Sequence, residues 1–181
     1  MPAATIPGGR LNPIDNCYVI IPIKDGEFVL TFNNLPEITD SKSASYNDEL
    51  VIGRASPIKT YSQSDNRTIS MQMHMIVSAP GDIQHNLACL RAIQSATYPR
   101  DGENGAPFVP PPVCRIKCGK LLSNEGELCV ILKSYSVKFP TEVSWDEGTF
   151  VPFKFDIDTN WDVVYKSSDL PGQDRIFTLG K

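Results

Sequence analysis

The strongest pattern along the chain is an alternation of apolar and polar positions over residues 68–77. The apolar positions of this segment are Ile69, Met71, Met73, Met75 and Val77. A period of two places successive side chains on opposite faces of a strand. The pattern therefore predicts a strand with one buried face and one mostly polar face. His74 falls on the polar face, which favours a solvent-facing or interface histidine over a catalytic base.

Other segments predict further strands by alternation or by short apolar runs. They are residues 17–23, 28–32, 57–61, 114–118, 128–139 and 151–157. Asp25-Gly26, between the first two, is typical of a two-residue hairpin turn. Pro152 has no N–H to donate to a ladder, so the last strand is expected to start there or to lie at a sheet edge.

Between the first hairpin and the alternating strand, the sequence predicts little regular structure. Residues 33–47 are polar and rich in turn residues, which is typical of a loop. Residues 50–52 form a short apolar stretch that ends at Gly53, and the chain continues in an extended conformation over residues 57–61.

The period changes after residue 80. Apolar residues recur at the spacing of one helix face at Ile83, Leu87, Leu90 and Ile93. Asp82 can cap the first turn, and Pro99 ends the stretch because the residue before a proline is pushed out of the helical region. The pattern therefore predicts one helix, about residues 82–97, whose apolar stripe lies on a sheet. His85 falls in its first turn, an exposed position.

Together these elements predict a mainly β fold, an antiparallel β-barrel or sandwich with one flanking helix. Residues 17–165 are expected to form this domain. Residues 1–16 hold three prolines and two adjacent glycines and predict an extended N-terminal arm, while residues 166–181 form a polar C-terminal tail. Residues 100–112 predict a loop whose final prolines are either a rigid lead into the next strand or a polyproline ligand.

Composition and charge narrow the function classes. The chain has 17 Lys plus Arg and 21 Asp plus Glu, a formal net charge of −4, which argues against a basic nucleic-acid surface or a membrane surface. The longest apolar run, residues 18–22, is far shorter than the ~20 residues of a membrane span. The first twenty residues lack the basic start and apolar stretch of a signal peptide. Nucleic-acid, membrane and secreted classes are therefore disfavoured.

The cysteines favour buried thiols over disulfides or zinc. There are five, an odd number: Cys17, Cys89, Cys114, Cys118 and Cys129. Without a secretory signal, this count fits a reducing compartment. In a strand, Cys114, Ile116 and Cys118 share one face, as core side chains do. A zinc site would need two tight ligand pairs, and neither histidine is near Cys114 or Cys118 in the sequence.

The remaining candidate chemistry is weak. The chain has no phosphate-binding Gly-rich loop and no hydrolase or metalloprotease motif. Asp156-x-Asp158-x-Asn160 resembles the start of a calcium loop, but the positions that need Gly and Glu hold Trp161 and Ser167. The two aspartates are also explained as the solvent face of an alternating strand.

The spacing of the carboxylates also argues against a glycosidase. Asp146 and Glu147 are adjacent turn residues, and cannot hold two carboxyls across a sugar ring at the ~5–9 Å that glycoside cleavage needs. The sequence therefore predicts no catalytic, cofactor or metal site and no enzyme.

A series of short motifs is more informative through its order than through any one member. In chain order they are Leu35-Pro36-Glu37-Ile38, Val51-Ile52-Gly53-Arg54, Pro57-Ile58, Tyr61, Arg67-Thr68-Ile69-Ser70, Tyr98-Pro99, Pro111-Pro112-x-Cys114-x-Ile116-x-Cys118-Gly119, the strand 128–139, Trp145 and Phe150-x-Pro152-Phe153. Over residues 35–165 this order resembles the tube-like baseplate proteins of contractile-tailed phages and related injection systems. That family includes members with a LysM module after this domain.

The resemblance implies a structural role. Domains of this family are similar to tail-tube subunits, in which a β-barrel with a flanking helix is arranged in rings and inner sheets join across subunits. It implies a homo-oligomeric ring, other baseplate and tail-tube proteins as partners, no cofactor and no small-molecule substrate. It also implies a location in the virion, after assembly in the host cytoplasm. A tube initiator, a hub–tube adaptor and a wedge connector all fit.

Two departures from the family pattern limit what the resemblance implies. The chain stops soon after its last predicted strand, so peptidoglycan binding through LysM is not expected. Cys118 stands where the family usually has an aromatic residue before the glycine.

An alternative from another class is a β-sandwich module that binds carbohydrate or cell wall. Its support is three aromatic residues able to lie on a surface: Trp145, Trp161 and Tyr165. Tryptophans near strand ends more often anchor a core. A lysin-like hydrolase is a third reading, with the least support from the sequence.

Overall fold

The computed structural model describes residues 16–164, apart from residues 24, 25, 33, 51, 54, 100–108 and 123–125. This part of the chain forms strands and one helix, α1 (Pro80–Thr97). The strands are β1 (Cys17–Ile23), β2 (Gly26–Thr31), β3 (Glu37–Ser41), β4 (Ala44–Glu49), β5 (Ile58–Ser64), β6 (Thr68–Ile76), β7 (Cys114–Cys118), β8 (Leu128–Lys138) and β9 (Lys154–Val163).

Seven strands form one antiparallel sheet in the order β2-β1-β7-β8-β9-β6-β3, and β4 and β5 pair separately. The prediction of a mainly β, antiparallel fold with one helix is confirmed. The prediction of a closed barrel is wrong, because β2 and β3 do not pair with each other and the seven-stranded sheet stays open. The apolar alternation shows which face of a strand is buried, but it does not show whether the two edge strands meet.

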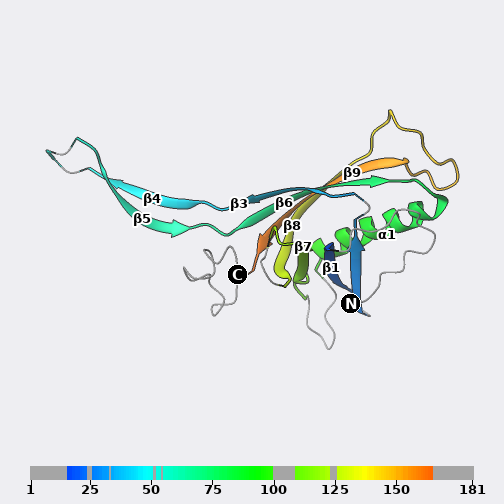
Figure 1. Cartoon of the computed structure of the whole chain (residues 1–181), viewed down its shortest axis with the longest axis horizontal. Helices are drawn as coiled ribbons and strands as arrows, with labels where there is room; N and C mark the ends of the chain where they lie inside the picture. Colours follow the sequence, from blue (N-terminus) through cyan, green and yellow to red (C-terminus); the bar gives the residue numbers. More distant parts are fainter. Residues whose placement is uncertain are drawn as a thin grey trace.

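The hydrophobic core lies between one face of this sheet and α1, as Figure 1 shows. The alternating strand is confirmed, since Ile69, Met71, Met73 and Met75 are buried and His74 lies on the other face. Cys114, Ile116 and Cys118 also share the buried face, as predicted.

A bulge in β8 explains why its pattern changes along the strand. In the first half of β8, Val130 and Leu132 are buried. In the second half, the residues packed against the core are Tyr135 and Val137, which are partly buried. The register with β9 shifts between Leu132 and Ser134. One extra residue reverses which positions face the core.

The first hairpin and the start of the last strand follow the sequence prediction. β1 and β2 pair down to Ile23 opposite Gly26, which leaves two residues for the turn. β9 begins two residues after Pro152, and it is an inner strand between β8 and β6. Pro152 therefore lies just before the strand, close to the predicted start, and the alternative of an edge strand is wrong.

The helix begins slightly earlier than predicted, at Pro80. Asp82 lies in its first turn, and its buried carboxylate accepts hydrogen bonds from the backbone N–H groups of Ser78 (2.9 Å) and Ala79 (2.8 Å). Asp82 thus caps the helix from inside its first turn, and Ala79 is the N-cap residue. The helix ends before Pro99, as expected.

Asp82→Ala is expected to destabilise the fold by about 1–3 kcal/mol, because it removes the acceptor for two backbone donors in a buried place. Asp82→Asn keeps one acceptor oxygen and is expected to lose less. Urea unfolding followed by circular dichroism measures both. Equal stability of wild type and Asp82→Ala would contradict this role.

Residues 33–47 were expected to form a loop, and this prediction is wrong. β3 lies within this stretch and β4 begins in it, and both belong to one long hairpin. β3 pairs with β6, β4 pairs with β5, and the hairpin extends well beyond the sheet (Figure 1). These strands were missed because nearly all their side chains are exposed, so no apolar face marks them.

The predicted arm and tail fall almost wholly outside the described residues. Of the arm, residues 1–16, only Asn16 is described, and the tail, residues 166–181, lies outside entirely. Most of the predicted loop 100–112 also lies outside.

Candidate functional site

The most unusual surface of the molecule is the far end of the long hairpin. We call the described part of residues 44–64, which includes β4 and β5, the distal ribbon. All six residues of β4 are exposed, and in β5 only Ile58 and Thr60 are partly buried. In Figure 1 no other element lies beside the distal ribbon. Among the described residues, its strands therefore have only each other to pack against.

Exposed apolar side chains gather on the distal ribbon. At its tip, Leu50 is 88% exposed and Ile52 is 103% exposed, as much as in an extended peptide. Tyr46 and Tyr61 lie opposite each other on β4 and β5, with ring centroids 5.8 Å apart in an edge-to-face arrangement, and both are exposed. Exposed large apolar side chains that gather on one projecting element favour an interaction site there.

Polar contacts fix the direction in which the distal ribbon leaves the sheet. Arg67, just before β6, forms two hydrogen bonds with the carboxylate of Asp40 on β3, at 2.8 and 2.5 Å, and a third with the carbonyl of Leu122 at 3.0 Å. Asp65 N donates to Ser43 O at 2.9 Å, and the two side chains are hydrogen-bonded to each other. A two-point Arg–carboxylate contact restrains orientation as well as distance.

The outer face of the sheet carries paired polar side chains. His74 on β6 and Asp156 on β9 lie opposite each other, with Nδ1 and Oδ1 2.6 Å apart. Asn160 joins Ser70 (2.8 Å) to Ser134 (3.1 Å) across three strands. Such cross-strand pairs stabilise a sheet. Within the described residues, no Ser, Thr or Cys side chain is hydrogen-bonded to His74, so the His–Asp pair lacks an aligned nucleophile.

The calcium-like cluster is part of this face. Asp156, Asp158 and Asn160 alternate along β9, which confirms their reading as one face of a strand. Each has a polar neighbour on an adjacent strand; for Asp158 it is Lys138, with Nζ 3.2 Å from Oδ2. Over the described ranges, no group of three or more His, Cys, Asp or Glu side chains could hold a metal ion.

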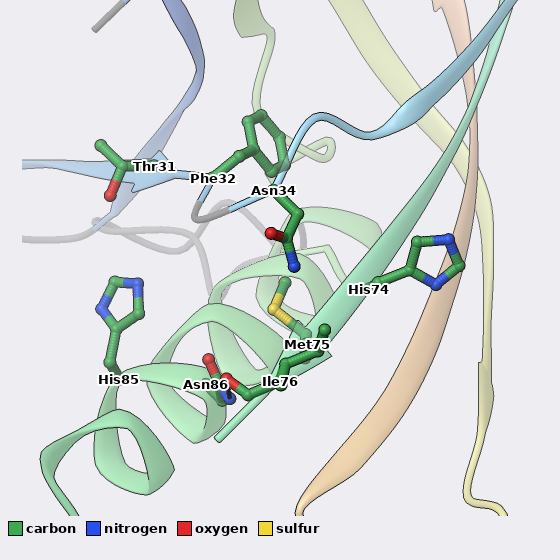
Figure 2. Close-up of a pocket in the computed structure, with 8 residues that line it drawn as sticks. All are labelled: Thr31, Phe32, Asn34, His74, Met75, Ile76, His85 and Asn86. Atoms are coloured by element: carbon green, nitrogen blue, oxygen red, sulfur yellow. Dashed lines mark hydrogen bonds between the residues drawn. The ribbon is translucent and has the colours of Figure 1, made fainter. Parts of the chain in front are cut away.

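A small hollow lies between β2, β6 and the first turns of α1 (Figure 2). Its volume is about 10 Å³, barely that of one water molecule. In Figure 2, His74 projects from β6 on the side away from Met75 and the helix. Asn86 donates to the carbonyl of Ile76 at 3.3 Å, a structural bond between α1 and β6.

His85, also beside this hollow, is partly buried and not fully exposed as expected. Burial lowers its pKa, which favours the neutral ring. Its Nε2 lies 3.5 Å from Sγ of Cys89, one turn along α1. Burial raises the pKa of Cys89 to about 12, so the thiol stays protonated at neutral pH. The pair is therefore not an activated nucleophile of the kind that cysteine hydrolases use.

The remaining thiols follow the prediction with one exception. Cys17, Cys114 and Cys118 are buried, as Cys89 is, but Cys129 is exposed. The early part of β8 is apolar on both faces, and Cys129 lies on the face that α1 does not cover. Cys17 and Cys118 are neighbours, which could not be predicted because strand register is not visible in the sequence.

The aromatic residues offered for carbohydrate binding do not form a common surface. Trp161 is completely buried, and its Nε1 donates to Thr159 Oγ1 at 2.8 Å. Trp145 packs on the exposed Phe150, with ring centroids 5.2 Å apart. Tyr165 lies outside the described residues. The expectation that such tryptophans anchor a core is confirmed for Trp161.

In the part of the chain that is described, no helix combines the length and the apolar character needed to cross a bilayer. Neither the models of known protein families nor the curated proteins give a match to this sequence.

Proposed function

We propose that this chain is a structural subunit of a contractile phage tail baseplate, assembled around the central tube, and that its distal ribbon contacts another subunit. The observation that carries the proposal is the exposure of nearly all the described side chains of the distal ribbon in the single chain. The motif order over residues 35–165 supports the baseplate assignment. The tube initiator, the hub–tube adaptor and the wedge connector share this mode of assembly.

The energetics of a two-stranded ribbon favour an intermolecular role. An isolated hairpin is at best marginally stable in water, and strands normally need a third strand or a packed layer. Here β4 buries no side chain within its own chain. A second subunit that covers Leu50, Ile52 and the two tyrosines would supply the missing apolar contact.

The topology favours head-to-tail contacts between copies. The hairpin leaves the sheet from β3 and β6, at one edge, while β2 lies at the opposite edge. β2 (GEFVLT) has none of the lysines or prolines that commonly protect an edge strand. Because the ribbon and the β2 edge are different surfaces, a contact between them would be heterologous, and such contacts close into rings when the rotation fits.

The double variant Leu50→Asp, Ile52→Asp tests the contact. It places two charges in the proposed interface, and self-association measured by sedimentation velocity is expected to weaken at least about tenfold, equivalent to about 1.4 kcal/mol. The matched variant Leu50→Val, Ile52→Val keeps both positions apolar and is expected to associate like the wild type. Unchanged association of the charged variant would contradict a contact through the tip.

Immunogold electron microscopy tests the baseplate assignment separately. Antibodies against the purified chain are expected to label contractile-tailed particles at the end of the tail distal to the capsid. Labelling of the capsid, or of no particle that contains the chain, would contradict a baseplate location even if the chain self-associates.

A further inference from the structure

Cys17 and Cys118 form a thiol pair at one end of the β1–β7 ladder. They are the terminal register partners of this ladder, and their sulfur atoms are 2.9 Å apart. The two residues are 2% and 3% exposed and are 101 positions apart in the sequence. A contact between thiols so far apart in the chain is fixed by strand register.

The type of strand pair suits a disulfide. Gly119 N donates to Asn16 O at 2.6 Å, so the adjacent Asn16–Gly119 pair is a hydrogen-bonded one. Pair types alternate along an antiparallel ladder, which makes Cys17–Cys118 a non-hydrogen-bonded pair with a Cα separation of about 4.5 Å. Disulfides span Cα separations of about 4.4–6.8 Å, so the backbone needs little adjustment.

The other cysteines are not placed for the same reaction. Cys114 lies on the same strand as Cys118, four residues away, which is about 13 Å along a strand. Cys129 is exposed on the opposite face of the sheet, and Cys89 lies on α1. Oxidation within one chain should therefore select Cys17 and Cys118.

We propose that Cys17 and Cys118 are a site of reversible oxidation, at which a disulfide oxidant of the glutathione class forms a cross-strand disulfide that joins β1 to β7. The Cys17 thiolate attacks one sulfur of oxidised glutathione and releases one glutathione thiolate. Cys118, after losing its proton to solvent, attacks the Cys17 sulfur of the mixed disulfide and releases the second glutathione. The chain loses two protons and two electrons, and oxidised glutathione is reduced to two glutathione molecules.

The hydrogen bond between the two thiols decides which of them attacks oxidised glutathione first. The hydrogen bond between the thiols lowers the pKa of Cys17, against the opposing effect of burial. The same hydrogen bond, together with burial, raises the pKa of Cys118. Access comes from the position of the pair, because Cys17 is the first residue of β1 and Cys118 the last of β7. Strand ends open locally at much lower free energy than the centre of a sheet.

Peptide mapping of the full-length chain tests this proposal, which does not depend on the proposed function. The native protein is incubated with oxidised glutathione, unfolded, alkylated with iodoacetamide and digested without reduction. We expect a peptide pair linked through Cys17 and Cys118, and alkylated Cys89, Cys114 and Cys129. Oxidation should also raise Tm by about 5–10 °C, because the crosslink closes a long loop in the unfolded chain.

Variants supply the control. Cys129→Ser is expected to keep the linkage, while Cys17→Ser and Cys118→Ser are expected to lose both the linkage and the rise in Tm. The peptide map of the wild-type protein tests the Cys17–Cys118 linkage even if a variant folds poorly. Alkylated Cys17 and Cys118 after oxidation, stable glutathione adducts without a linkage, or random pairing among the five cysteines would each overturn the proposal.

Discussion

Phe155→Asp is expected to abolish folding of the domain. Phe155 is 0% exposed, lies opposite Met75 on β6 and packs 5.7 Å, centroid to centroid, from the ring of Phe139. Loss of a buried aromatic side chain costs about 3–5 kcal/mol, and an unpaired buried charge costs several more. This approaches the whole stability of a typical domain, about 5–15 kcal/mol. Circular dichroism and the loss of a cooperative thermal transition measure the effect.

The neighbouring position provides a matched control. Lys154 is exposed on the opposite face of the same strand, and Lys154→Asp is expected to change stability by less than about 0.5 kcal/mol. A folded Phe155→Asp with a normal Tm would contradict the placement of the core between the sheet and α1.

Removal of the distal ribbon is expected to separate folding from assembly. Ala44 and Ser64 are register partners, so residues 45–63 can be replaced by Asn-Gly, the typical sequence of a two-residue hairpin turn. The shortened chain is expected to keep its Tm within about 3 °C, because the removed part buries almost no side chain in the rest of the molecule. Self-association is expected to weaken about 100-fold or more, since the whole proposed contact is gone.

A second variant serves as the control, because it changes the ribbon but leaves its apolar side chains in place. Lys59→Ala removes the exposed ion pair with Asp48, whose atoms are 2.9 Å apart, and such pairs contribute less than about 1 kcal/mol. It is expected to associate normally. A shortened chain that associates as strongly as the wild type would exclude the ribbon as the contact, whereas a shortened chain that does not fold would show that the ribbon is part of the core domain.

The strands that border the core could be predicted from the sequence because burial imposes a period on it. β6 has a buried residue at every second position, and β7 shows the same over five residues. β3 and β4 have no such period, because their side chains face solvent. The partner of β3 is β6, which follows only after the whole ribbon, and polar residues with weak strand propensity are typical of a loop. Closure of the sheet could not be predicted for the same reason, since it depends on which edges meet.

The candidate sites could likewise be predicted only where a local pattern in the sequence marks them. The aspartates of β9 were recognised as a strand face because alternation is local. The contact between Cys17 and Cys118 and the salt bridge of Arg67 to Asp40 depend on register between distant segments. One signal for the ribbon was present in the sequence: Tyr46 and Tyr61 stand on either side of the apolar stretch 50–52, which ends at Gly53, as aromatic residues on the two strands of a hairpin can.

Cross-linking between isotopically distinct copies tests the intermolecular contact most directly. Lys59 lies on the distal ribbon with an exposed side chain, and the ribbon extends away from the body of its own chain (Figure 1). A short amine-reactive linker is applied to a mixture of unlabelled and ¹⁵N-labelled full-length chains. We expect mixed-isotope linkages from Lys59 to lysines on the seven-stranded sheet, such as Lys117 or Lys138. If Lys59 gives no mixed-isotope linkage at the highest soluble concentration, copies of this chain do not complete one another through the ribbon.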